Sequence, residues 1–261
     1  MKLAYCVLLL CYSQLCSACP AITFQVGPFF STTFIAKYWQ NFALSIEDEL
    51  GCTVNIQASS SYEHFLDILA KPQGDIFITP THYVYALQSK NLTAILKSEN
   101  TAQIYLLSRH DISKDGASVL RGDIILVPSP YTQAYLELLE WLTDNGLKNK
   151  VSFDFNHSHD SATLLMLKGK YSSAVVLGNV YERFPDFIKA KYPAIKLPAK
   201  GGASILTKSD ASPDLNQAII NSKDKLNLLK WAKAPPSSPS DAFSQVFANQ
   251  LERYLEGQPN N

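Results

Sequence analysis

The stretch "VPSPYTQAYLELLEWL" runs from Val127 to Leu142 and changes from a polar turn to a helical pattern of apolar residues. An apolar run ends at Val127, and two prolines and the hydroxyl-bearing residues Ser129, Tyr131 and Thr132 follow. Apolar residues then recur at the spacing of an α-helix. The stretch therefore predicts a buried strand, a polar turn and the start of a helix.

The same alternation of strand and helix fills most of the chain. Strands are predicted at 22–26, 53–58, 75–78, 124–127, 151–155, 174–177 and 203–207, and helices at 34–50, 131–145, 161–168, 213–230 and 241–256. Strands that alternate with helices are typical of an α/β fold, with mostly parallel sheets flanked by helices. The fold class predicted from the pattern is α/β.

The pattern restarts near the middle of the chain, which predicts two lobes. Extended segments near 103–110 and 196–207 would join them. We expect lobe 1 to contain residues 20–105 and 206–261, and lobe 2 to contain residues 106–205. Ligands of such sheets bind at the carboxyl ends of the strands, so the site is expected in a cleft between the lobes.

The first residues have the outline of an export signal. Met1 and Lys2 precede an apolar stretch at 3–12, and a small-residue segment ends at Cys19. We expect residues 1–18 to be a signal peptide and the protein to be periplasmic, with lipidation at Cys19 and plain cleavage after Ala18 or Ala21 as alternatives. Because four of the five cysteines lie in or beside this leader, no disulfide framework is expected, and Cys52 is interpreted as a small buried residue.

The composition excludes some partners and function classes. Of the 261 residues 46 % are hydrophobic, and 23 basic and 23 acidic residues give a formal net charge of zero, without the basic footprint of a nucleic-acid-binding protein. The sequence has no Gly-x-Ser-x-Gly elbow, zinc-binding His-Glu-x-x-His helix or Gly-rich phosphate loop. We therefore expect no nucleic acid, no cofactor and no catalytic residues.

Hydroxyl-bearing residues stand at several predicted helix starts. Ser60 with Glu63 resembles a capping box, and Pro80 and Pro130 are expected at or beside first helical positions. Helix N-termini leave backbone N–H groups unpaired and carry partial positive charge, so several that share one cleft could bind an oxyanion. The alternative is that these residues are ordinary caps. The candidate ligand-binding residues at these starts are Ser31, Thr79, Thr81, Ser129 and Thr132.

Aromatic and imidazole groups stand beside these turns. Tyr62, Tyr83 and Tyr131 could line a ligand, or they could be half-buried packing residues. His157, His159 and Asp160 lie at a strand-to-helix junction, but the other histidines show no supporting spacing, so no metal site is expected. One imidazole that donates a hydrogen bond to an anionic ligand is the favoured interpretation.

Five stretches together resemble the PhnD-like phosphonate-binding family of periplasmic solute-binding proteins, which has the type 2 periplasmic binding protein fold. They are "ITFQVGPFFSTTF", "DELGCTVNIQASSSYEHFLDIL", "GDIFITPTHYVYAL", "RGDIILVPSPYTQAYLELLEWL" and "HSHDSATLLMLKGKYSSAVV", and the resemblance spans about 22–257. It implies a two-lobed protein that delivers a solute to an ABC permease without catalysis.

The resemblance also implies roles for particular residues. Tyr62 and Tyr83 match tyrosines that hold the anionic head, and His159 matches the histidine of the family's Ser-His-Asp turn. Ser129, Tyr131 and Thr132 fall on the family's anion loop, although this loop lacks the usual glycine. Where family members that bind aminophosphonates have acidic residues in the second lobe, this chain offers Ser172, Ser173 and Asn179, with Glu182 several residues further on, which argues against an aminophosphonate. Phosphate, phosphite, a simple phosphonate and an unrelated small molecule all remain open.

The leading hypothesis is a monomeric exported protein that binds a small anionic solute and closes around it by hinge motion. The alternative is a periplasmic sensor that docks on a membrane receptor such as a histidine kinase. A hydrolase or transferase is the third possibility and predicts turnover.

Overall fold

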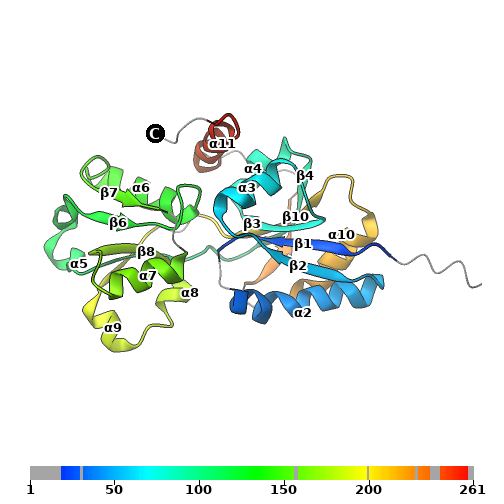
Figure 1. The fold of residues 1–261 in the computed structure, drawn as a ribbon, viewed down its shortest axis with the longest axis horizontal. Helices are drawn as coiled ribbons and strands as arrows, with labels where there is room; N and C mark the ends of the chain where they lie inside the picture. Colours follow the sequence, from blue (N-terminus) through cyan, green and yellow to red (C-terminus); the bar gives the residue numbers. More distant parts are fainter. Residues whose placement is uncertain are drawn as a thin grey trace, which may run out of the picture.

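The computed structural model describes residues 19–29, 32–155, 158–198, 200–226, 229–235 and 242–257. The predicted signal peptide, Ser31 and His157 lie outside these residues. Figure 1 shows two lobes side by side, each with a sheet and flanking helices. The predicted two-lobed α/β fold is confirmed.

Lobe 1 is built on a sheet with the strand order β11-β4-β10-β3-β1-β2. Its strands are β1 (Ile22–Val26), β2 (Val54–Ala58), β3 (Ile76–Pro80), β4 (Leu92–Ser98), β10 (Ala203–Lys208) and β11 (Trp231–Lys233). Its helices are α2 (Thr32–Leu50), α3 (Tyr62–Ala70), α4 (Tyr83–Gln88), α10 (Pro213–Asn221), the 3-10 helix η2 (Ser222–Lys225) and α11 (Ala242–Leu255).

Lobe 2 is built on a sheet with the order β7-β6-β8-β5-β9. Its strands are β5 (Ile104–Ser108), β6 (Ile124–Leu126), β7 (Ser152–Asp154), β8 (Ser173–Leu177) and β9 (Ala194–Lys196). Its helices are α5 (Ile112–Asp115), the 3-10 helix η1 (Ala117–Leu120), α6 (Gln133–Asp144), α7 (His159–Leu167), α8 (Gly178–Tyr181) and α9 (Asp186–Lys191).

Both sheets are mixed rather than mostly parallel. The βα units give parallel pairs, β1 with β2 and β3, and β6 with β7 and β8. The strands that enter from the crossovers pair antiparallel, β10 with β3 and β4, and β5 with β8 and β9. The expectation of mostly parallel sheets missed these strands, because a chain that returns from the other lobe enters its sheet in the opposite direction.

The segments between β4 and β5 and between β9 and β10 connect the lobes. They lie close together, because the amide of Ala102 donates to the carbonyl of Gly201 at 2.6 Å. A Cβ atom on Gly202 would lie 2.0 Å from Ser98 Oγ, so only glycine fits where the segments meet. The sheets therefore divide the chain at 99–103 and 197–202, a few residues from the expected boundaries, since β5 and β10 each belong wholly to one sheet.

The predicted helix starts are wrong in detail. Ser61, not Ser60, caps α3 by accepting from the amide of His64. Pro80 is the last residue of β3, where it faces Ala203 of β10, and Pro130 lies in the turn before α6. Thr132 is the N-cap of α6 instead, because its hydroxyl accepts from the amide of Tyr135.

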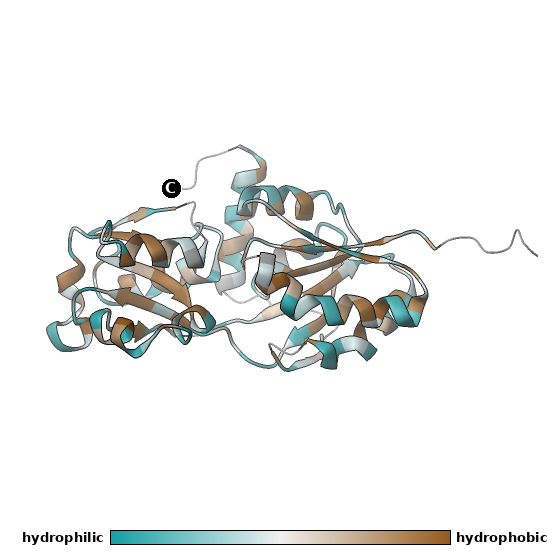
Figure 2. Ribbon diagram, turned by 60° about the horizontal axis from the view of Figure 1, so that its bottom comes forward, coloured by the Kyte–Doolittle hydropathy of each residue, from teal (hydrophilic) through white to brown (hydrophobic). Residues whose placement is uncertain are grey.

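Apolar side chains fill the space between each sheet and its helices. Figure 2 shows hydrophobic residues along the strands and on the inner sides of helices, with hydrophilic residues outside. Phe24, Trp39 and Phe42 are fully buried in the core of lobe 1, and Leu106, Ile125 and Leu138 in that of lobe 2. No helix among the described residues has the length and apolar character needed to cross a bilayer.

The structure contains a disulfide that the sequence interpretation missed. Cys19 and Cys52 are bonded, with their Cα atoms 5.2 Å apart, and so join the residues before β1 to the turn after α2. The expectation of no disulfide and of Cys52 as a merely buried residue is wrong, because Cys19 had been counted with the leader. Parallel pairing of Ile22 with Val54 brings the two positions together.

Candidate functional site: a cavity between the lobes

A cavity of about 420 Å³ lies between the lobes, against the crossover segments. Residues from both lobes and from both crossovers line it. Lobe 1 contributes Phe29, Trp39, Ile78, Thr79, Pro80 and Leu229; lobe 2 contributes Thr132, Gln133, Ala134, His159, Leu177, Gly178, Asn179 and Glu182; the crossovers and the start of β10 contribute Asn100, Thr101, Ala102, Gln103, Gly202 and Ala203. Its volume is in the range of small-molecule sites.

Two helices of lobe 2 begin at this cavity. Thr132 caps α6 through the amide of Tyr135, which leaves the amides of Gln133 and Ala134 without intrahelical acceptors. Ser158 caps α7 in the same way, through the amide of Ser161, and His159 is the first helical residue. Both N-termini place partial positive charge at the wall, which favours an anion there.

Several buried polar atoms of the wall have no hydrogen-bond partner in the described part of the chain. They are Trp39 Nε1, Thr79 Oγ1, Gln103 Oε1, His159 Nδ1 and Asn179 Oδ1. Unpaired buried polar groups are rare in folded proteins because each costs about 1–3 kcal/mol. Their position around one cavity indicates a site that a polar ligand completes.

Few charged side chains stand at this wall. No lysine or arginine is found among its lining residues as the structure describes them, and the one carboxylate, on Glu182, is exposed. Burial lowers the pKa of His159 to about 4, against a hydrogen bond with the backbone of Val175, so the imidazole is neutral at pH 7. Recognition must therefore come from hydrogen bonds and helix dipoles.

Thr79, Thr132 and His159, three of the candidate ligand-binding residues, lie together on the cavity wall. The tyrosines are packed elsewhere, in a cluster with helix α11. Tyr83 Oη donates to the carbonyl of Tyr131 at 2.9 Å, which joins the lobes, and the Tyr83 ring stacks on Phe247 at 3.9 Å. Figure 1 shows α11 over the junction of the lobes. Ligand contact by these tyrosines stays a prediction.

Tyr62, Ser129 and Thr81 also lie off the cavity wall. The Tyr62 ring packs against Phe29, and burial raises the pKa of its hydroxyl. The carbonyl of Ser129 accepts from the Thr132 hydroxyl at 2.8 Å, so Ser129 shapes the turn before α6. Thr81 accepts from the Ser204 hydroxyl at 3.3 Å.

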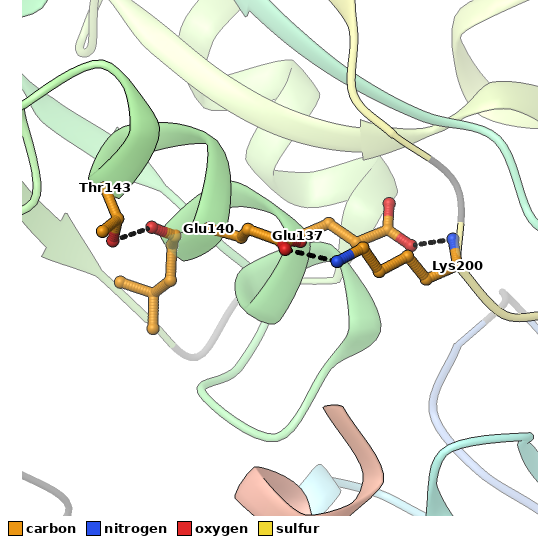
Figure 3. A network of polar contacts seen from close by, with 5 residues as sticks. Glu137, Glu140, Thr143 and Lys200 are labelled. Atoms are coloured by element: carbon orange, nitrogen blue, oxygen red, sulfur yellow. Dashed lines mark hydrogen bonds and ion pairs between the residues drawn. The ribbon is translucent and has the colours of Figure 1, made fainter. Parts of the chain in front are cut away.

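A polar network ties α6 to the second crossover. Glu137 Oε1 accepts from Gln133 Nε2 at 2.6 Å. It also accepts from the amide of Lys200 at 3.0 Å, and Glu140 pairs with the Lys200 ammonium (Figure 3). Gln133 also donates to the carbonyl of Gly201 at 3.0 Å. Burial raises the pKa of Glu137 to about 7. Because Gln133 lines the cavity, this network links the site to the connection between the lobes.

Sequence reasoning missed much of the wall. Gln133 and Ala134 directly follow the predicted helix start, so the unpaired amides of that start could have identified them. Trp39 appeared only as one apolar position of a helix, and the segment from Asn100 to Gln103 has no periodic pattern. The described residues hold no group of three or more His, Cys, Asp or Glu side chains that could bind a metal ion.

A protein-family model described as "ABC transporter, phosphonate, periplasmic substrate-binding protein" matches residues 24–222. No curated protein matches the chain significantly in sequence.

Solved structures share the fold at low identity. A binding protein component of an ABC phosphonate transporter (PA3383) from Pseudomonas aeruginosa has a TM-score of 0.68 and 12% identity, over 91% of this chain and 87% of that one. PhnD1 from Prochlorococcus marinus, in complex with methylphosphonate, has a TM-score of 0.68 and 12% identity, over 90% and 98%. The BvgS VFT2 domain (double mutant F375E/Q461E) of Bordetella pertussis has a TM-score of 0.54 and 11% identity, over 93% and 96%.

Proposed function

Because this chain belongs to the family of periplasmic substrate-binding proteins of ABC phosphonate transporters, we propose that it binds a small oxyanion between its lobes and delivers it to an ABC permease. The oxyanion is of the phosphonate, phosphate or phosphite class. The protein is exported, acts as a monomer and catalyses no reaction.

The observation that carries this proposal is the convergence of two helix N-termini and unpaired buried polar atoms on one cavity. The first amides of α6 supply donors from lobe 2, and Thr79 Oγ1 supplies a hydroxyl from lobe 1. An oxyanion that accepts from both lobes favours the closed arrangement, which is how a binding protein signals occupancy to a permease.

Thr79→Val is expected to weaken oxyanion binding roughly tenfold or more, because hydrogen bonds to charged groups contribute about 1.5–3 kcal/mol. Valine has nearly the shape of threonine, and the lost hydroxyl has no hydrogen-bond partner among the described residues, so the free energy of unfolding should not fall. Calorimetry with phosphate, phosphite and methylphosphonate, and urea unfolding without ligand, would measure both effects.

Ser59→Ala is the matched control. Ser59 Oγ is also buried and has no hydrogen-bond partner in the described part of the chain, but Ser59 does not line the cavity. Wild-type affinity in the Thr79→Val variant, or an equal loss in both variants, would contradict the placement of the ligand.

A sensor that docks on a membrane receptor is the second candidate, and the likeness in fold to the BvgS VFT2 domain favours it. Transport predicts that deletion of the gene abolishes uptake of the bound solute. Sensing predicts unchanged uptake and a lost transcriptional response to that solute.

A further inference from the structure

The two lobes line the cavity with different kinds of side chain. Lobe 2 brings the starts of α6 and α7, with the polar groups of Thr132, His159 and Asn179. Lobe 1 brings mainly apolar side chains, and among its described lining residues only Thr79 is an exception. The cavity therefore has a polar wall on lobe 2 and an apolar wall on lobe 1.

The apolar wall is a continuous patch. Trp39 and Ile78 belong to the hydrophobic core of lobe 1, and Ala203 and Leu229 pack against the same core. All four line the cavity, and we call them the apolar subsite. Trp39 and Ile78 are buried, whereas Ala203 and Leu229 are half-buried, so a ligand can cover the latter two and remove apolar surface from water.

The position of Leu229 is fixed by its neighbours in the chain. The carbonyl of Lys230 accepts from the amide of Glu99 at 2.8 Å, at the beginning of the first crossover. Trp231 then pairs with Ser98 as β11 joins β4. Leu229 is therefore anchored beside the crossover, on the lobe 1 side of the cavity.

The size of the cavity favours an organic ligand. Its volume of about 420 Å³ lies in the range of sites that hold organic molecules. Phosphate and phosphite contain no carbon, so either ion would leave the apolar subsite in contact with water. An apolar group attached to the anion would cover these side chains, and the hydrophobic effect would then add to the affinity.

The charges of the wall favour an uncharged substituent. Glu182, the carboxylate among the described lining residues, belongs to lobe 2 and is exposed. An ammonium group buried against Ile78 and Leu229 would lose its hydration without gaining a counter-ion, which is costly. An alkyl group in the same place has no such cost.

We propose that the ligand is a phosphonate with an uncharged apolar substituent of several carbon atoms, which packs on the apolar subsite while the anionic head lies at the helix starts of lobe 2. This inference rests on the proposed function and specifies its substrate class. Thr79 Oγ1 and Trp39 Nε1, which have no hydrogen-bond partner in the described part of the chain, remain available to the head.

Alkylphosphonates of increasing length test the proposal on the full chain, purified after export. Calorimetry with methyl-, ethyl-, propyl- and butylphosphonate should show an affinity that rises roughly threefold to fourfold with each methylene, or about 50-fold from methyl to butyl. Inorganic phosphate and phosphite should bind more weakly than butylphosphonate.

Propylphosphonate and 2-aminoethylphosphonate form a matched pair, because a methyl group in the first replaces the amine of the second at the same chain length. The uncharged compound should bind roughly tenfold tighter or more, since the amine would have to be buried without a counter-ion.

Leu229→Ala tests the placement of the substituent. It should reduce the ratio of butylphosphonate to methylphosphonate affinity roughly fivefold, because it removes apolar atoms from the subsite. Leu50→Ala is the matched control: Leu50 is also half-buried against the core of lobe 1, but it does not line the cavity.

The heat capacity of binding gives a second measurement, which needs no variant to fold. Burial of apolar surface makes the heat-capacity change of binding negative. In the wild-type protein this change should become more negative with each added methylene.

Four results would overturn the proposal. Equal affinity and equal heat-capacity change along the series, or tightest binding of phosphate or phosphite, reject the apolar substituent but leave oxyanion binding intact. Tighter binding of 2-aminoethylphosphonate than of propylphosphonate rejects an uncharged one. A wild-type ratio in Leu229→Ala, or an equal loss in Leu50→Ala, rejects the assigned subsite. Binding of none of these anions rejects the proposed function, and the inference with it.

Discussion

Glu137 is a buried carboxylate whose protonation should be visible in the stability of the protein. Burial raises its pKa from 4.5 to about 7, while hydrogen bonds from Gln133 and the Lys200 amide lower it. Between these pH values the folded chain binds more protons than the unfolded chain. The free energy of unfolding should therefore fall as the pH rises from about 4.5 to about 7, and then level off.

Glu137→Gln is expected to remove this pH dependence, which should amount to something on the order of 1–3 kcal/mol. Urea unfolding at several pH values measures it. Glu140→Gln is the control, because Glu140 lies one helical turn away in an exposed pair with Lys200 and should leave the slope in place. A Glu137→Gln variant that keeps the wild-type slope would show that another group titrates.

For single residues, the sequence predicted where a residue lies along a strand or helix better than it predicted what its side chain contacts. Thr79, Thr132 and His159 lie on the cavity wall because strand ends and helix starts meet at one edge of an α/β sheet. Tyr83 and Tyr131 occupy similar positions, yet their rings pack under α11, since an aromatic ring can lie on either side of a turn. Trp39 and Gln103 reach the cavity from a core helix and a crossover, and no local pattern marks such residues.

Among the elements, α11 shows where sequence patterns stop being informative. The spacing of its apolar residues predicts a helix, but it does not predict which elements that helix packs against. In the structure α11 packs on α4, and its residues Phe247, Leu251 and Tyr254 join a cluster that also contains Tyr131 of lobe 2. The last helix thus helps to hold the two lobes together on the side where the tyrosines lie.

Phe247→Ala is expected to destabilise the protein by about 3 kcal/mol or more, because the fully buried ring stacks on Tyr83. Urea unfolding followed by circular dichroism measures the loss. Val246→Ala provides a neighbouring control: its side chain is 48% exposed, so it should change stability by less than about 0.5 kcal/mol. Similar effects of both substitutions would mean that α11 is not docked in solution.

For the molecule as a whole, the strand and helix order predicted the two lobes, while long-range contacts had to come from the structure. The crossovers meet through Ala102 and Gly201, residues about a hundred positions apart. The disulfide between Cys19 and Cys52 is another such contact, since it depends on the register of β1 with β2.

Cys52→Ser should lower the free energy of unfolding by about 3–4 kcal/mol, the chain-entropy contribution expected for a cross-link that spans 33 residues. Urea unfolding of the oxidised wild type and the variant measures it. Wild type treated with a reductant should match the variant; equal stability of all three would show that the bond adds nothing.

The bond also constrains how the molecule can be tethered. Acylation of a bacterial lipoprotein attaches diacylglycerol through a thioether to the cysteine sulfur, and the Cys19 sulfur is already joined to that of Cys52. A copy with this bond therefore cannot carry a diacylglycerol on Cys19, whereas a copy lipidated at Cys19 has no disulfide partner for Cys52. Maleimide labelling after denaturation would distinguish these two populations, and in the copy with the bond we expect no label at Cys52.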